Sequence, residues 1–187
     1  MTRRLTLICQ GATAATRVSA FPADDPLEEL ALRKHRPGPV KQGYAQVLVS
    51  PSRAAQETAT LLGLSGTVEP ALQDMDVGRW AGQGLANIAP EDLARWLSDP
   101  DFAGHGGESL GNFIARAGDW LNTMAEGHGA VIAVTSAAFI RACIGGVLST
   151  PFEAFWRIDI APLTETDLRH DGRRWALRAL GRGLLEL

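Results

Sequence analysis

The sequence predicts an α/β fold, a three-layer sandwich in which helices cover both faces of a mainly parallel sheet. Short segments that are apolar throughout alternate with segments of helical periodicity, and this pattern is typical of strands buried on both faces. The chain has 187 residues, of which 45% are hydrophobic. It can therefore bury one core and is short for two. Because no linker composition or internal repeat divides it, we expect a single domain over residues 1–187.

The first predicted strand runs from Leu5 to Cys9, an apolar segment followed by a turn at Gln10-Gly11. The stretch from Ser19 to Gly43 then carries four prolines and mixed charges. We interpret this stretch as a surface excursion with one short helix from Leu27 to Lys34.

The second predicted strand, from Ala45 to Val49, leads directly into Ser50-Pro51-Ser52-Arg53. Ser50 suits a helix N-cap and Pro51 suits the first helical position. We therefore expect a helix that continues to about Leu62.

The remaining predicted elements alternate in the same way. They are a short strand from Gly66 to Glu69, a loop from Gly78 to Gly84, a helix from Pro90 to Trp96, a helix from Leu110 to Met124, a strand from Ala130 to Thr135, a helix from Ala137 to Leu148, and strands from Trp156 to Ile160 and from Trp175 to Ala179 with a turn at His170-Asp171-Gly172. The helix from Leu110 has the clearest amphipathic spacing.

Charge and composition exclude several classes of protein. Eighteen basic and 21 acidic residues give a net charge of -3, which disfavours nucleic-acid binding. No apolar stretch approaches the ~20 residues that a membrane span needs, and the apolar run near the N-terminus is too short for a signal peptide. Two cysteines form neither a disulfide framework nor a zinc pattern. We expect a reduced, cytoplasmic protein.

In folds of this class the ligand binds beyond the carboxyl ends of the strands. The site should therefore consist of Cys9-Gln10-Gly11, Ser50 to Arg53, and Thr135-Ser136. A helix that starts directly after a strand favours an anion at its first turn. Two alternatives remain for Arg53: its side chain points to solvent, or it meets a phosphate or carboxylate.

Five segments, in order, resemble the motifs of the histidine phosphatase, or phosphoglycerate-mutase-like, superfamily. That family opens with a strand ending in Arg-His-Gly-Glu-Thr, and the matching residues here are Cys9-Gln10-Gly11-Ala12-Thr13. Its Ser-x-x-x-Arg-Ala-x-Gln-Thr-Ala motif is similar to Ser50–Ala59 with one residue inserted, and its Leu-x-Glu-x-x-x-Gly-x-Trp-x-Gly motif to Leu72–Gly82. Gly-Gly-Glu-Ser stands intact at 106–109, and the last motif, a strand ending in His-Gly-Gly followed by a helix containing Arg, is similar to Val134–Arg141.

The resemblance implies phosphoryl transfer without metal or cofactor. In the family a histidine attacks phosphorus, cationic side chains hold the phosphoryl oxygens, and an acid protonates the leaving oxygen. Here Gln10 takes the nucleophile position, Cys9 the position of the first arginine, and Ser136 that of the second histidine. Asp74 takes the acid position, and Arg53 is retained. Gly11 forms the turn beside these residues, and Arg17 could replace the missing arginine.

For several other reactive side chains, a structural role is the favoured interpretation. A thiolate phosphatase uses Cys-x5-Arg, whereas seven residues separate Cys9 from Arg17. We therefore interpret Cys9 as a buried side chain. His105 either approaches the pocket or is a solvated loop histidine, and we favour the latter. We expect Arg141 to be structural and Glu108 to stabilise the start of the long helix.

A carboxamide cannot replace imidazole as a nucleophile, so we favour a degenerate member of the family. Such a protein would bind a small phosphorylated or anionic ligand around Arg53, Gln10 and Ser136 without forming phosphohistidine. The alternative is a phosphomonoesterase of altered mechanism that uses Asp74 and Arg53. A third reading is a protein that binds a protein partner, or forms a homodimer, and has a non-functional pocket.

Overall fold

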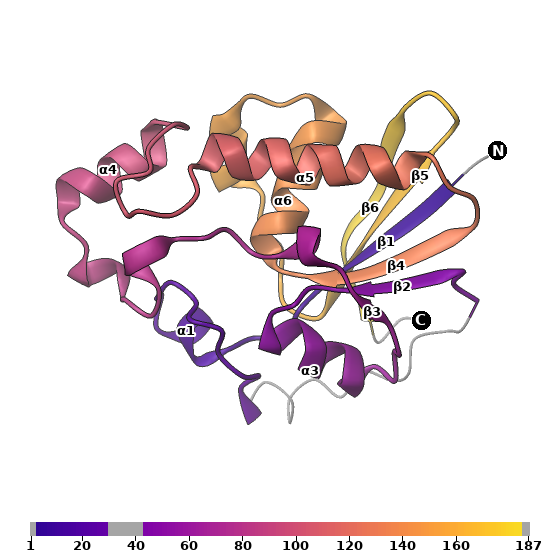
Figure 1. Ribbon diagram of the computed structural model, residues 1–187, viewed down its shortest axis with the longest axis horizontal. Helices are drawn as coiled ribbons and strands as arrows, with labels where there is room; N and C mark the ends of the chain where they lie inside the picture. Colours follow the sequence, from indigo (N-terminus) through magenta and orange to yellow (C-terminus); the bar gives the residue numbers. More distant parts are fainter. Residues whose placement is uncertain (1–2, 30–42, 185–187) are drawn as a thin grey trace.

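The computed structural model describes residues 3–29 and 43–184, and its centre is one six-stranded sheet of order β3-β2-β4-β1-β5-β6 (Figure 1). Its strands are β1 (Arg3–Cys9), β2 (Gln46–Val49), β3 (Thr67–Val68), β4 (Ala130–Thr135), β5 (Thr164–His170) and β6 (Trp175–Gly183). Its α-helices are α1 (Ala14–Arg17), α3 (Arg53–Leu61), α4 (Pro90–Ser98), α5 (Leu110–Ala125) and α6 (Ala137–Leu148). Four short 3-10 segments are Pro70–Leu72, Gly78–Trp80, Leu85–Asn87 and Phe152–Arg157.

The strands β3, β2, β4 and β1 pair with one another in parallel, whereas the pairs β1–β5 and β5–β6 are antiparallel. β4 pairs in parallel with both β1 and β2, while β5 runs antiparallel to β1 and forms a hairpin with β6. The register places Cys9 opposite Thr135. The residues that follow these two strands therefore emerge side by side, which confirms the predicted mainly parallel sheet.

Helices cover both faces of the sheet, as the apolar strands predict (Figure 1). Leu5 and Leu7 of β1 face α5 and α6, where they share a core with Phe113 and Phe139. Ile8 points to the opposite face and packs in a second core with Ala55 of α3. Successive side chains of a strand alternate between faces, so one apolar segment supplies two cores.

The start of α3 differs from the prediction by two residues. Ser52, not Ser50, is the N-cap, because its side chain accepts a hydrogen bond from the Ala55 amide. The Ser50 hydroxyl is buried and accepts from the Ser52 amide at 3.4 Å. Arg53 is therefore the first helical residue, and Pro51 precedes the helix.

The predicted strand from Trp156 to Ile160 is wrong. The segment Phe152–Arg157 is a 3-10 helix, and the strand that pairs with β1 is β5. The polar sequence at the start of β5, Thr-Glu-Thr-Asp, does not predict a buried strand. In the structure, however, Glu165 and Asp167 are buried. Neighbouring arginines offset their charges: Arg182 pairs with Glu165, and Arg169 with Asp167.

The turn at His170-Asp171-Gly172 is confirmed as the connection between β5 and β6. The Asp171 carboxylate accepts hydrogen bonds from the amides of Arg173 and Arg174. The predicted helix from Leu27 to Lys34, in contrast, falls for the most part outside the described residues.

An aromatic cluster around Trp80 connects α4 and the segments before α5. Phe21 lies 5.3 Å and His105 4.9 Å from the Trp80 ring. Gly78 allows this packing: its φ is +51°, and a Cβ there would lie 2.4 Å from the His105 carbonyl oxygen. His105 is 1% exposed, so the expected solvated loop histidine is wrong.

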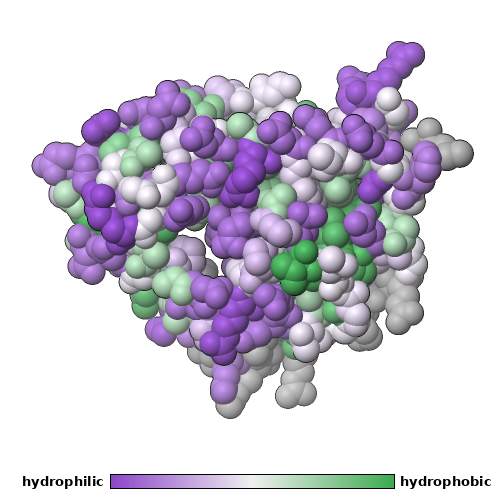
Figure 2. All heavy atoms as spheres, viewed as in Figure 1, coloured by the Kyte–Doolittle hydropathy of each residue, from purple (hydrophilic) through white to green (hydrophobic). Residues whose placement is uncertain are grey.

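Hydrophilic residues cover most of the face seen in Figure 2, with smaller groups of hydrophobic residues among them. None of the helices within residues 3–29 and 43–184 is long and apolar enough to cross a membrane.

Candidate functional site

A cavity of about 450 Å³ lies at the carboxyl ends of β1 and β4, where the sequence places the site. Its walls include Cys9, Gln10, Gly11, Thr13, Asp74, Ser136, Ala137, Ala138, Arg141 and Asp159. A smaller neighbouring hollow shares Gln10 and Asp74 and adds Asp24, Asp25 and Ser52. Five of the seven predicted site residues therefore meet in one place. No histidine is among the described residues that line either space.

Gln10 is held at the cavity by its backbone and its side chain. Its amide donates to the Thr135 carbonyl at 2.8 Å, which continues the β1–β4 ladder by one step. Its Oε1 atom accepts from the Ser52 hydroxyl at 3.0 Å. The carboxamide thus connects the end of β1 to the start of α3.

Ser136 and Asp74 form the second polar contact of the cavity. The Ser136 hydroxyl donates to Asp74 Oδ1 at 2.7 Å and accepts from the Phe139 amide at 3.1 Å. Ser136 is therefore the N-cap of α6 as well as a partner of the acid. The Met75 amide donates to the same Asp74 oxygen at 2.8 Å.

Burial raises the pKa of the Asp74 carboxyl above its ordinary value, although the hydrogen bond from Ser136 opposes this effect. Desolvation disfavours a charged carboxylate. Asp74 therefore keeps its proton to a higher pH than an exposed aspartate does, which is the property that a general acid needs.

Cys9 contributes a neutral wall rather than a nucleophile. Burial, and secondly the nearby Asp74, raise the pKa of its thiol to about 12. The thiolate is the reactive form of cysteine, so Cys9 is inert at neutral pH.

Arg53, which the motif resemblance assigns as the retained arginine, is not among the residues that line the cavity. Its Nε donates to Glu57 Oε1 at 2.8 Å, one turn along α3, and its side chain is 58% exposed. The first-turn amide of Arg53 also has a partner, because it donates to Asp24 Oδ1 at 2.7 Å. A carboxylate of the chain itself thus occupies the N-terminus of α3.

The contacts of Arg17 and Gly11 indicate structural roles. Arg17 pairs with Glu28 at 2.7 Å on the surface and lies outside the cavity lining. The Gly11 amide donates to the Thr58 hydroxyl at 2.9 Å, and a Cβ at Gly11 would lie 2.8 Å from the Leu27 side chain. Gly11 is therefore required by close packing.

Arg141, which the sequence analysis interprets as structural, lines the cavity. It lies one turn into α6, and it is the one cation among the described residues of the cavity wall. Its guanidinium lies 4.0 Å from Asp159 and 5.9 Å from the Phe155 ring centroid. Its position one turn after Ser136 was the available signal, because it faces the same end of the sheet.

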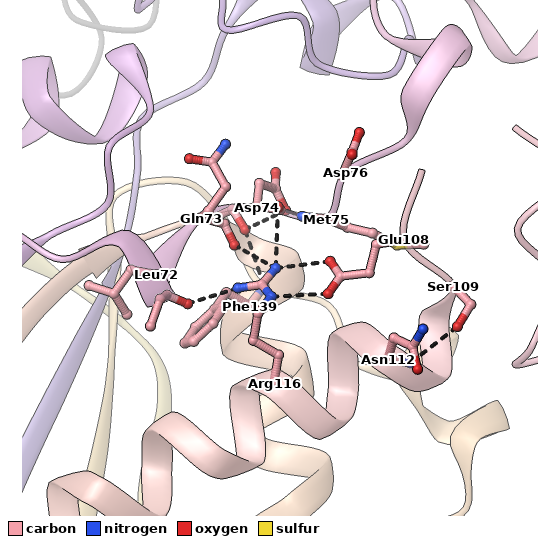
Figure 3. Close-up of polar contacts among 12 residues, drawn as sticks. Leu72, Gln73, Asp74, Met75, Asp76, Glu108, Ser109, Asn112, Arg116 and Phe139 are labelled. Carbon is pink, nitrogen blue, oxygen red and sulfur yellow. Dashed lines mark hydrogen bonds and ion pairs between the residues drawn. The ribbon is translucent and has the colours of Figure 1, made fainter. Parts of the chain in front are cut away.

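Arg116 of α5 fixes the segment that carries Asp74 (Figure 3). Its guanidinium donates to both oxygens of Glu108 at 3.0 Å, to the Ala71 carbonyl at 2.8 Å and to the Gln73 carbonyl at 3.1 Å. Glu108 therefore anchors Arg116, and Ser109 caps α5 through the Asn112 amide. The helix-starting role expected for Glu108 is wrong.

His105 lies apart from the cavity. Its Nδ1 accepts from the Gly107 amide at 3.1 Å, and burial lowers the pKa of its ring. It is a neutral member of the aromatic cluster. Within the described ranges, no group of three or more His, Cys, Asp or Glu side chains is arranged to hold a metal ion.

Comparisons with known proteins agree with this architecture. A mycobacterial glucosyl-3-phosphoglycerate phosphatase with bound VO3 superposes with a TM-score of 0.78 at 25% identity, over 97% of this chain and 100% of that one. A phosphoserine phosphatase from Entamoeba histolytica with 3-phosphoglyceric acid gives a TM-score of 0.82 at 16% identity, over 98% of this chain and 99% of that one. The second likeness is one of fold alone. No curated protein matches in sequence at a significant level.

The sequence comparison with protein families identifies the same relationship. The model of the Histidine phosphatase superfamily (branch 1) matches residues 32–182. This match spans most of the chain and both halves of the sheet. The chain therefore belongs to the histidine phosphatase superfamily.

Proposed function

We propose that this protein binds a small anionic or phosphorylated ligand at the strand ends and does not form phosphohistidine. The observation that carries the proposal is the pair of side chains at the ends of β1 and β4. The motif resemblance assigns Gln10 and Ser136 to the positions of the family's histidines, and each side chain is already hydrogen-bonded to a neighbour, Ser52 or Asp74.

Neither side chain can start covalent phosphoryl transfer. The Gln10 carboxamide has no basic nitrogen, and the Ser136 hydroxyl has no neighbouring base stronger than a carboxyl whose pKa is raised. Cys9 is excluded by the high pKa of its thiol. The cavity lies where the fold predicts it, but the described residues of its wall include no imidazole that could form phosphohistidine.

Arg141 supports binding at the α6 side of the cavity, because the carboxylate beside it, Asp159, is fully exposed and 4.0 Å away. Arg141 supplies a positive charge there, and the first-turn residues Ala137 and Ala138 line the same space. The first amides of a helix have no partner within the helix and favour an anion. At α3, Asp24 already fills the corresponding place.

The decisive experiment compares phosphatase activity and anion binding in one set of variants. Aryl phosphates and phosphorylated metabolites are offered to the wild type, to Asp74→Asn, and to the double variant Gln10→His with Ser136→His. We expect no turnover by the wild type above the level of Asp74→Asn. We also expect a thermal shift with phosphate or sulfate that decreases in Arg141→Gln. Wild-type turnover that disappears in Asp74→Asn would overturn the proposal.

One observation favours a second candidate, a phosphomonoesterase of altered mechanism. The raised pKa of Asp74 suits a residue that protonates a leaving oxygen. In that case Asp74 would assist direct attack by water, and the same assay would detect it. If no anion produces a shift, the protein-partner function gains support instead. A cytoplasmic location and a homodimer stay predictions from the sequence.

A further inference from the structure

A second cavity of about 210 Å³ lies on the other side of Arg141, between α5, α6 and the 3-10 segment Phe152–Arg157. We call it the apolar cavity. Its lining is formed mainly by Ile114, Ala142, Gly145, Gly146, Phe152 and Phe155. The engineered cavity of ~150 Å³ that binds benzene is smaller, so one aromatic ring fits in this space.

Two glycines keep the apolar cavity open. Gly145 and Gly146 are inside α6, where glycine stabilises a helix less than alanine does. Packing does not require them: a Cβ at Gly146 would meet nothing within 4 Å, and one at Gly145 would make an ordinary contact of 3.4 Å with Thr150. Gly145 lies three residues after Ala142, on the same helix face, so a side chain there would enter the cavity.

Arg141 lines both this cavity and the strand-end cavity. Its side chain is 25% exposed, and its Nε is buried without a hydrogen-bond partner. The nearest carboxylate, Asp159, is fully exposed and 4.0 Å away. Arg141 therefore keeps hydrogen-bonding capacity for an anion at the boundary of a polar and an apolar space.

We propose that the ligand is an aromatic anion, a phosphate monoester or carboxylate whose charged group pairs with Arg141 and whose ring enters the apolar cavity. This inference rests on the proposed function, because it assumes anion binding at the α6 side. Burial of one ring removes enough apolar surface from water to raise affinity by roughly ten- to a hundredfold.

The test is isothermal titration with three probes: inorganic phosphate carries the charge alone, phenol the ring alone, and phenyl phosphate both. For the wild type we expect phenyl phosphate to bind at least ~10-fold more tightly than inorganic phosphate. Gly145→Leu fills the apolar cavity from α6 and should reduce phenyl phosphate to the affinity of inorganic phosphate. Gly118→Leu is the matched control, since Gly118 is inside α5, has open space around its Cβ position and does not line the cavity.

A second variant keeps the test decisive if Gly145→Leu does not fold. Ile114→Phe fills the same cavity from α5 and should have the same effect. The inference is overturned if phosphate and phenyl phosphate bind the wild type equally, or if the advantage of phenyl phosphate survives the cavity-filling changes.

The two proposals can fail separately. If phenol binds and Gly145→Leu abolishes this binding while neither phosphate probe binds, the apolar cavity is a ring site, and both the aromatic-anion ligand and the proposed anion binding are overturned. If phosphate binds and the ring adds nothing, the proposed function stands and this inference falls. If none of the three probes binds, both are overturned.

Discussion

Helices α3 and α6 both begin at the carboxyl ends of neighbouring strands, and both have a serine N-cap, yet their first turns meet opposite charges. At α3 the Arg53 amide contacts the Asp24 carboxylate, and the Arg53 side chain pairs outward with Glu57. At α6 the first turn borders the cavity together with Arg141. The difference is the reason that the proposed function places the anion at α6: a carboxylate of the chain occupies the start of α3, whereas a cation lies beside the start of α6.

The largest expected effect concerns the network that holds Asp74 beside α6. Arg116→Ala leaves Glu108 partly buried without its charge partner and removes hydrogen bonds to two carbonyls. We expect the free energy of unfolding to fall by about 3 kcal/mol, measured by urea denaturation.

The matched control is Arg174→Ala, which breaks an exposed pair with Asp171 at 3.9 Å. It should cost less than about 0.5 kcal/mol. If the free energy of unfolding falls equally in the two variants, the Arg116 network does not stabilise the segment that carries Asp74.

The second effect separates the two helix starts directly. Arg141→Gln should weaken sulfate binding about tenfold, because it removes the cation of the cavity wall. Arg53→Gln should change the affinity by less than about twofold, since this side chain points away from the cavity. Isothermal titration measures both, and the reverse order of effects would assign the anion to α3.

A smaller effect follows from the raised pKa of Asp74. As the pH rises through this pKa, Asp74 loses its proton and adds a negative charge next to the α6 site. Sulfate affinity should therefore decline with rising pH above the ordinary carboxyl range. Sulfate keeps a constant charge there, so a flat profile in Asp74→Asn would assign the decline to this residue, and an unchanged profile would exclude it.

The smallest effect is expected at Asp24. Asp24→Asn removes one negative charge from the hollow beside the cavity, so sulfate affinity should rise by about twofold. Asp101→Asn removes the same charge at a position outside both linings and should leave the affinity unchanged. A loss of affinity in Asp24→Asn would mean that Asp24 supports the site rather than competing with an anion.

The sequence predicts the parallel half of the sheet well because apolar segments such as Leu5 to Cys9 have few other environments available to them. It fails at β5, since Glu165 and Asp167 are polar residues whose burial depends on arginines of other strands: Arg182 of β6 pairs with Glu165, and Arg4 of β1 with Asp167. Such long-range pairing leaves no periodic signal in the segment itself.

The candidate site, like the sheet, is predicted from the sequence only in part. The backbone positions of Gln10 and Ser136 follow from the strand ends, and the structure brings both to one cavity. The directions in which the side chains of Arg53 and Arg141 point cannot be predicted from their positions in the sequence. Glu57 draws Arg53 outward, whereas Arg141 extends along the cavity wall, and only the packed structure distinguishes the two.

A crystal structure with bound tungstate, a phosphate analogue, tests the central claim most directly. We predict one anion in the strand-end cavity, within hydrogen-bond distance of Arg141 and the first-turn amides of α6, while Asp24 stays bonded to the Arg53 amide. An anion held by the Arg53 guanidinium, with Asp24 displaced from α3, would contradict this account.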